Sequence, residues 1–240
     1  METVVKLGDL HVPFEDKKAV GIAFDFCKDM RPDIIVTDEW HDFYSISRFS
    51  KDPNRITSLQ KDLDLTESYF AVLRDKCPNS RIIHVESNHM KRLKKFIRNK
   101  APELDCLRAL RIDNLIDFKR YDIEYIDFFI YKDVLYKHGN RIHKYSGYTA
   151  KNEYEDEGMS GASNHSHRIG LHCRTKRGGV YDWMECGCLC DLHAEYMEGK
   201  TADWQHGFGL VLYDNDDYIL HPMRMKNYRI IWQDTLRRGR

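Results

Sequence analysis

The sequence predicts an α/β fold, and two observations indicate it. In the first half of the chain, short β-branched runs alternate with segments whose apolar residues have helical spacing. In the second half, apolar runs are separated by short polar turns, as in antiparallel strands. No linker composition or internal repeat divides the 240 residues, so we expect one domain spanning residues 1–240.

The first half reads as strand, helix, strand, helix, strand, helix. The predicted elements cover residues 4–7, 17–30, 34–36, 56–77, 81–85 and 91–99. Each predicted strand runs into polar residues at its carboxyl end. Open α/β sheets bind their ligands at this edge, so we expect a site there.

The second half reads as paired strands. We expect residues 123–130 to pair with 134–137, 169–174 with 180–190, and 209–213 with 218–220. Residues 139–161 are rich in glycine, tyrosine and charge. They predict a loop with a short helix over the site, where Tyr145 and Tyr148 could contact a base or sugar.

Composition excludes several classes of function. Lysine plus arginine and aspartate plus glutamate number 38 each, so no global field attracts nucleic acid or an anionic membrane. No apolar run approaches the roughly 20 residues of a membrane-spanning helix, and the N-terminus does not resemble a signal peptide. Seven cysteines, an odd number, do not indicate a disulfide framework. We therefore expect a cytoplasmic protein without a membrane partner.

Side chains that bind divalent cations stand at five separate predicted strand ends, four of them after a strand and the last before one. Carboxylates, imidazoles and amide oxygens are such ligands. The candidates are Asp9, His11, Asp38, Asn88, His138, His165 and His167. Asp9 and His11, like His165 and His167, are two positions apart, so an extended backbone projects each pair to one side. One such pair is weak evidence, but the ordered set predicts a metal site.

The order D-x-H, D, N-H, H, H-x-H over positions 9–167 resembles the calcineurin-like metallophosphoesterases. Residues 42–49 and 203–208 are also similar to small phosphoesterases of bacteriophages. The resemblance implies a four-layer αββα sandwich of two mixed β-sheets flanked by helices. It further implies two divalent cations, Mn²⁺ or alternatively Fe, Zn, Ni or Mg, and hydrolysis of phosphate esters by a bridging hydroxide. If the protein is phage-encoded, it would act in the host cytoplasm.

The resemblance also assigns a role to each residue. One cation would be bound by Asp9, His11 and His167, and the other by Asn88, His138 and His165. Asp38 would bridge the two cations. His89 would face the phosphate as an acid or charge stabiliser.

A second aspartate of the family lies three positions after the bridging one and orients the catalytic histidine. Counted from Asp38, that position holds His41, and Asp42 follows it. Either Asp42 orients His89 through a one-residue bulge, or His89 is oriented otherwise. Other departures are Thr37, Ser87 and Asn164 in place of glycine, and Met90 in place of an acidic residue.

A basic run follows His89, and we take Lys91 and Arg92 from it as candidate substrate-binding residues. Its members are Lys91, Arg92, Lys94, Lys95, Arg98 and Lys100, and the tail at residues 237–240 could add to it. The run is either a solvated helix face or a surface that contacts a polyanion. The substrate is therefore predicted to be a nucleotide or nucleic acid. The alternatives are a phosphoprotein or small-molecule phosphomonoesterase, and a non-catalytic metal-binding scaffold of the same fold.

Cys186, Cys188 and Cys190 alternate along the predicted strand 180–190. The spacing could suggest zinc, but structural zinc sites more often separate cysteines by two residues. We expect the three thiols to act as small apolar side chains on one strand face.

Overall fold

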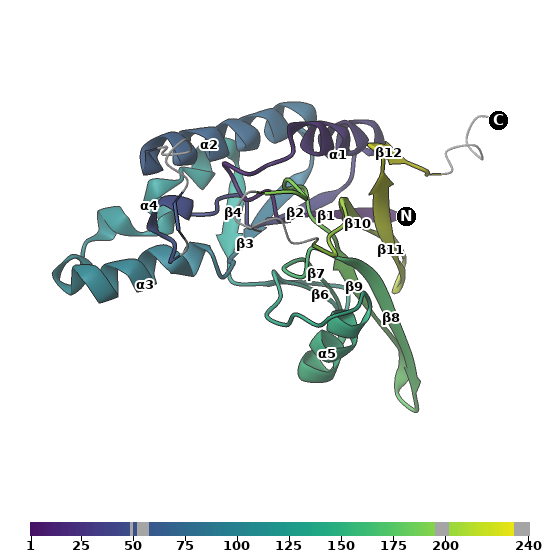
Figure 1. Ribbon diagram of the computed structural model, residues 1–240. Coiled ribbons are helices and arrows are strands. Elements are labelled where there is room, and N and C mark those ends of the chain that lie inside the picture. The colour runs from purple at the N-terminus through teal and green to yellow at the C-terminus, as the bar shows by residue number, and fades with distance from the viewer. Residues whose placement is uncertain (49, 52–57, 195–201, 233–240) are drawn as a thin grey trace.

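Two mixed β-sheets lie at the centre of the computed structural model, which describes residues 1–48, 50–51, 58–194 and 202–232 (Figure 1). The larger sheet has the strand order β12-β11-β10-β1-β2-β3-β4, and the smaller has the order β5-β6-β7-β9-β8. The strands of the larger sheet are β1 (Glu2–Leu7), β2 (Ile34–Asp38), β3 (Arg81–Val85), β4 (Ile123–Ile126), β10 (Gly207–Asp214), β11 (Asp217–Lys226) and β12 (Arg229–Ile230). Those of the smaller sheet are β5 (Phe129–Tyr131), β6 (Val134–Tyr136), β7 (Ser160–Ser163), β8 (Ile169–Lys176) and β9 (Gly179–Cys186).

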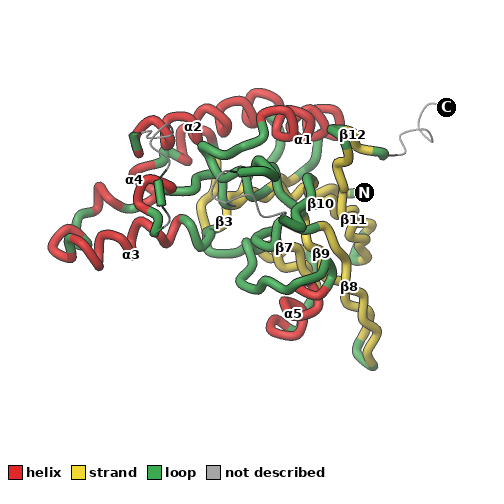
Figure 2. Tube along the Cα trace, viewed as in Figure 1, coloured by secondary structure: helices red, strands yellow, loops and turns green. Residues whose placement is uncertain are grey.

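Helices α1 (Lys17–Met30) and α2 (Leu59–Lys76) cover the outer face of the larger sheet (Figure 2). The Asp16 carboxylate caps α1 by accepting hydrogen bonds from the amides of residues 18 and 19, and the Ser58 hydroxyl caps α2. The predicted start of α2 at residues 56–57 lies outside the described residues. Apolar side chains of both helices pack against the β-branched strands, which fixes the helices on this face.

Helix α5 (Tyr148–Glu157) covers the outer face of the smaller sheet. Ala150 and Tyr154 of this helix pack against Leu135 and Trp183 of the sheet. The inner faces of the two sheets meet in a separate apolar core that includes Val36, from the larger sheet. The layers therefore run helix, sheet, sheet, helix, and the predicted four-layer αββα class is confirmed.

Helix α3 (Met90–Lys100) projects away from both sheets and leads into short helical turns (Figure 1). These turns are η3 (Pro102–Leu104), η4 (Arg108–Leu110), α4 (Ile112–Leu115) and η5 (Phe118–Tyr121), while η1 (Tyr44–Ile46) follows β2. In the part of the chain that the structure describes, no helix combines the length and apolar character needed to cross a membrane.

Three predicted elements differ from the structure. Residues 123–130 form two strands, because β4 pairs with β3 in the larger sheet while β5 pairs with β6 in the smaller one. The strand predicted at 180–190 ends at Cys186, where Gly187 takes a left-handed backbone with φ of 72°. The helix within 139–161 packs on the outer face of the smaller sheet instead of lying over the strand ends.

Candidate metal centre

The carboxyl ends of β1, β2, β3, β6 and β7 bring the predicted ligand residues together. β1, β2 and β3 are parallel neighbours, and so are β6 and β7 in the facing sheet. Because parallel strands end at the same edge, the loops that follow them meet where the two sheets face each other. All seven predicted metal ligands lie in or directly after these five strand ends.

Asp9, His11 and His167 form one group of donor atoms. The Nε2 atoms of His11 and His167 are 3.0 Å apart, and His167 Nε2 is 3.4 Å from Asp9 Oδ2. Their ligand atoms all lie within 4.8 Å of one another, and the three residues are buried. The structure thus brings together the residues that the family resemblance assigned to one cation.

Asn88, His138 and His165 form a second group. His138 Nε2 lies 2.6 Å from Asn88 Oδ1 and 3.1 Å from His165 Nδ1. Two atoms that can offer lone pairs, Asn88 Oδ1 and His165 Nδ1, therefore lie next to His138 Nε2. These are the residues that the family resemblance assigned to the other cation.

Glu39, which the sequence analysis missed, lies between the two groups. Its Oε1 is 3.2 Å from His11 Nε2 and its Oε2 is 2.7 Å from His138 Nε2. Oε1 is also 3.1 Å from His89 Nδ1. One carboxylate therefore places an oxygen in each group. A signal was available in the sequence, because Glu39 stands three positions before Asp42, the spacing of the resembled family.

Asp38 lies at the side of the cluster instead of between the two groups. Its Oδ2 forms a fully buried ion pair with the Lys6 ammonium, and its Oδ1 is 3.5 Å from His138 Nδ1. Although burial opposes ionisation, Lys6 and His138 hold the pKa of Asp38 below its usual value. Asp38 is therefore a charged partner of Lys6 that borders the second group.

Asp42 connects His11 and the predicted catalytic residue His89 with Arg92. Its Oδ2 lies 2.9 Å from His11 Nδ1 and 3.1 Å from His89 Nδ1. The Arg92 guanidinium donates to Asp42 Oδ1 and to its carbonyl oxygen, each at 2.8 Å. Burial opposes ionisation of Asp42, but the hydrogen bonds from His11 and His89 keep its pKa well below the usual range. Asp42 is thus placed to orient both imidazoles.

His41 does not take the orienting position. Its side chain is fully buried, neither ring nitrogen has a hydrogen-bond partner, and its ring packs edge-on against Phe43 at 4.1 Å. Burial lowers the pKa of His41 to about 4, so it stays neutral. The sequence left open whether Asp42 or another residue orients His89, and the geometry favours Asp42. No bulge is needed when the spacing is counted from Glu39.

The cluster has the electrostatics of a cation site. Burial and the neighbouring carboxylates raise the pKa of Asp9 to about 8. Although burial opposes protonation, Glu39 and Asp42 raise the pKa of His11 to about 9. The negative potential that attracts these protons would equally attract divalent cations, which displace protons from their ligands.

Buried polar atoms that lack a hydrogen bond are also available to bind a cation. Several buried atoms of the cluster lie near a His138 nitrogen or a carboxylate but make no hydrogen bond of acceptable geometry: Asp9 Oδ1, Asp38 Oδ1, Glu39 Oε2 and His138 Nδ1. Buried polar atoms are nearly always paired, so a group of orphaned oxygens indicates an absent partner. Buried His, Asp and Glu side chains here can therefore bind metal ions.

The backbone around the site is strained at several residues that are not glycine. Asp9, His11, Glu39, His165 and His167 all have φ between 41° and 66°. Such left-handed conformations are unfavourable for residues with a side chain and persist where the surrounding structure enforces them. They turn the loop side chains back toward the cluster.

The residues at the expected glycine positions have partners of their own. The Thr37 hydroxyl donates to the Ile83 carbonyl at 3.2 Å, and Asn164 Nδ2 donates to the Gly187 carbonyl at 3.0 Å. Glycine is required instead at Gly8, where a Cβ would lie 2.1 Å from Asp38 Oδ1.

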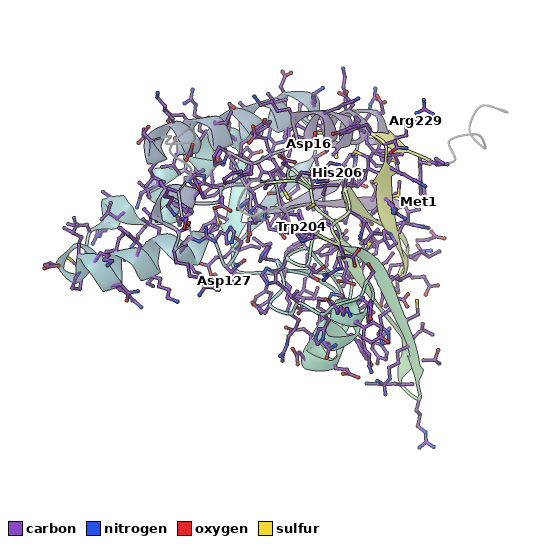
Figure 3. The ribbon with its side chains drawn as sticks, viewed as in Figure 1. Met1, Asp16, Asp127, Trp204, His206 and Arg229 are labelled. Carbon is purple, nitrogen blue, oxygen red and sulfur yellow. The ribbon has the colours of Figure 1, made fainter. Side chains whose placement is uncertain are left out.

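A cavity of about 280 Å³ opens beside the cluster. It is lined by His11, Glu39, Asp42, Tyr44, His89, Arg92, Ile142, His165, Ser166, His167, Arg168 and Trp204. Trp204, labelled in Figure 3, contacts the His167 ring edge-on with centroids 4.3 Å apart. The cavity thus joins two arginines and an apolar wall to the candidate metal centre.

The two predicted substrate-binding residues differ in position. Arg92 lines the cavity, whereas Lys91 pairs with Glu86 at 3.0 Å and points away from it. Tyr145 and Tyr148 are exposed and do not line the cavity, to which their segment contributes Ile142. Residue 49 and the basic tail at 237–240 lie outside the described residues.

Fold and site define an α/β protein with a buried histidine–carboxylate cluster that can bind metal ions. The chain is 30% identical over 230 residues to the Gene 54 protein of Mycobacterium phage D29, covering 89% of each chain. It is 28% identical over 227 residues to the Gene 54 protein of Mycobacterium phage L5, covering 88% of this chain and 89% of that protein. The chain therefore belongs to the family of these mycobacteriophage Gene 54 proteins.

No protein-family model matches the sequence. Among solved structures, Vps29 of Chaetomium thermophilum aligns with a TM-score of 0.42 and 11% identity, over 94% of this chain and 90% of that one.

Proposed function

We propose that this protein is a metal-dependent phosphoesterase of the calcineurin-like type. The observation that carries the proposal is Glu39, whose two carboxylate oxygens reach two separate groups of nitrogen and oxygen donors. One cation would be held by Asp9, His11 and His167, the other by Asn88, His138 and His165, with Glu39 bridging in the place that the family resemblance assigned to Asp38. Two such cations, of which Mn²⁺ is our first candidate, clamp phosphate oxygens and lower the pKa of a water molecule.

The protein's own residues orient the substrate and move the proton. Asp42 holds the Nδ1 side of His89, which leaves the other ring nitrogen to donate to the leaving oxygen of the phosphate ester. Arg92 fixes Asp42 with two hydrogen bonds and faces the cavity, so its remaining N–H groups can bind a phosphate oxygen.

The cavity supports a small phosphate ester, such as a nucleotide, as the substrate. It has cationic side chains at Arg92 and Arg168 and an apolar wall that includes Trp204 and Ile142. An aromatic wall suits a base, because every base offers a flat face for stacking. Of the α3 cations only Arg92 is among the residues that line the cavity, and Lys91 and Arg98 pair with Glu86 and Asp105. As the relatives are phage proteins, we place the reaction in the host cytoplasm.

Hydrolysis of p-nitrophenyl phosphate and of bis-p-nitrophenyl phosphate with Mn²⁺ tests this proposal. Turnover of the first alone would indicate a monoesterase, and turnover of the second a diesterase. A labelled oligonucleotide assayed beside free nucleotides then separates nuclease from nucleotidase. Cations bound without turnover of any of these substrates would contradict the proposal and favour a non-catalytic scaffold.

A further inference from the structure

The cysteine run after β9 places two thiols beside a ligand of the candidate metal centre. Cys186, the last residue of β9, packs in the core between the sheets. Beyond Gly187 the chain turns, and Cys188 and Cys190 lie on the other side, next to His167. The three thiols therefore do not share one face, contrary to the expectation from their alternation.

His167, Cys188 and Cys190 form a compact group of soft donors. His167 Nδ1 is 3.8 Å from Cys190 Sγ, and the ligand atoms of all three residues lie within 4.8 Å of one another. Both cysteines are fully buried and His167 is 5% exposed. In a tetrahedral zinc site, with Zn–S near 2.3 Å and Zn–N near 2.0 Å, the nitrogen and sulfur atoms are about 3.5 Å apart. The observed separation is close to that value.

We propose that His167, Cys188 and Cys190 bind a thiophilic cation of the Zn²⁺ type, distinct from the two cations of the proposed phosphoesterase centre. Thiolate and imidazole together select such cations over Mg²⁺ or Ca²⁺. His167 would serve both sites as a bridging imidazolate, which has released its remaining N–H proton to solvent, because Nε2 faces Asp9 and His11 while Nδ1 faces the thiols. The inference needs no catalytic activity of the neighbouring centre.

Backbone hydrogen bonds hold the two cysteines in place. The Leu189 amide, between them, donates to the Asp9 carbonyl at 3.1 Å, and the Asp16 amide donates to the Leu189 carbonyl at 2.9 Å. The Cys188 amide donates to the Gln205 carbonyl at 3.1 Å. The site is thus built on a fixed segment, and a cation there would tie the loop after β7 to the loop after β9.

His206 lies close to this segment but already has partners. Its Nε2 is 2.8 Å from the Cys190 carbonyl oxygen and 3.6 Å from Asp16 Oδ2; both His206 and Asp16 are labelled in Figure 3. It therefore acts as a support of the cysteine segment, and the proposed protein ligands number three.

Cobalt binding to the reduced, metal-free full-length protein tests the site. Thiolate ligands give Co²⁺ an intense near-ultraviolet charge-transfer absorption, whereas the nitrogen and oxygen donors of the neighbouring centre do not. As Co²⁺ is added to the wild type, we expect this absorption to rise until one Co²⁺ ion per chain is bound by the thiolates, and then to stay constant. Cys188→Ser and Cys190→Ser should each lose at least half of this absorption, because each removes one of the two thiolate ligands. The matched control Cys186→Ala, whose thiol packs in the core between the two sheets, should keep it.

The wild-type measurement alone can overturn the proposal, since no variant has to fold for it. Absence of the absorption in wild type would show that the thiols only fill space. Its undiminished persistence in both serine variants with native circular dichroism would assign it to other cysteines and would equally overturn the proposal. Neither result bears on phosphate hydrolysis. Conversely, the protein could show this absorption and yet hydrolyse no phosphate ester. That result would contradict the proposed function and leave the thiolate site supported.

Discussion

Glu39 and Asp42 share the same two histidine neighbours. Glu39 Oε1 is 3.2 Å from His11 and 3.1 Å from His89, while Asp42 Oδ2 is 2.9 Å from His11 and 3.1 Å from His89. Asp42 faces Nδ1 of His11, and Glu39 faces its Nε2. One carboxylate is thus placed to orient the imidazole, and the other to share a cation with it.

Glu39→Gln should lower turnover of p-nitrophenyl phosphate by at least about 100-fold, because one neutral amide oxygen cannot replace a carboxylate between two cations. The number of Mn²⁺ ions bound per chain should fall as well. Glu86→Gln, which removes a carboxylate paired with Lys91 outside the cavity, serves as the matched control. Full turnover in Glu39→Gln would remove Glu39 from the metal centre.

Asp38→Asn should act mainly on stability. Removing the charge leaves the Lys6 ammonium buried without its partner, which costs about 3–5 kcal/mol in the free energy of unfolding. Urea denaturation measures this loss, and the double variant Lys6→Met/Asp38→Asn should recover part of it. If Asp38→Asn is stable but inactive, Asp38 is the bridging ligand after all, as the motif order first suggested.

His89→Asn should lower kcat by roughly 10²–10⁴-fold, the usual contribution of a general acid. The imidazole lies at the cavity wall beside Asp42 and outside the two ligand groups, so Mn²⁺ binding should be retained. Steady-state kinetics together with metal analysis checks both parts. A variant that loses its cations would make His89 a ligand instead.

Removal of the cations by a chelator should abolish turnover, and Mn²⁺ should restore it. Unfolding should also occur at a lower temperature, since a ligand at 100 times its Kd stabilises the folded state by about 2.7 kcal/mol. Differential scanning fluorimetry with and without Mn²⁺ measures the shift. Equal unfolding temperatures would argue against a metal centre in the buried cluster.

The buried His84 should make the free energy of unfolding depend on pH. It is buried beside Trp40, Phe70 and Phe118, with Nδ1 bonded to the Thr37 hydroxyl at 2.8 Å. Burial lowers its pKa from 6.5 to about 3. The unfolded chain therefore binds a proton between these values that the folded chain does not, and stability present above pH 6.5 is lost as the pH falls.

His84→Gln, which cannot titrate, isolates this effect. Between pH 7 and pH 5 the wild type should lose about 2 kcal/mol more free energy of unfolding than the variant, at about 1.4 kcal/mol per pH unit. Urea denaturation at both pH values gives the difference. Parallel losses in the two proteins would show that His84 protonates as easily in the folded state.

The sequence by itself determined the α/β class and the residues at the strand ends. Helical and β-branched patterns are local, and a strand followed by polar residues marks its own carboxyl end. Asp9, His11, His138, His165 and His167 could therefore be selected before any contact was known. Their division into two groups came from the family resemblance, and the structure places the members of each group together.

Only the tertiary structure decided which carboxylate reaches both groups. Strand alternation keeps Asp38 on the same face as Lys6, between the sheets, whereas a left-handed backbone with φ of 41° turns Glu39 toward the histidines. Only the tertiary structure likewise decided the positions of Cys188 and Cys190, because the chain turns out of β9 at Gly187. These positions depend on where a strand stops and what faces it from another sheet, and such long-range contacts leave no periodic signal in the chain.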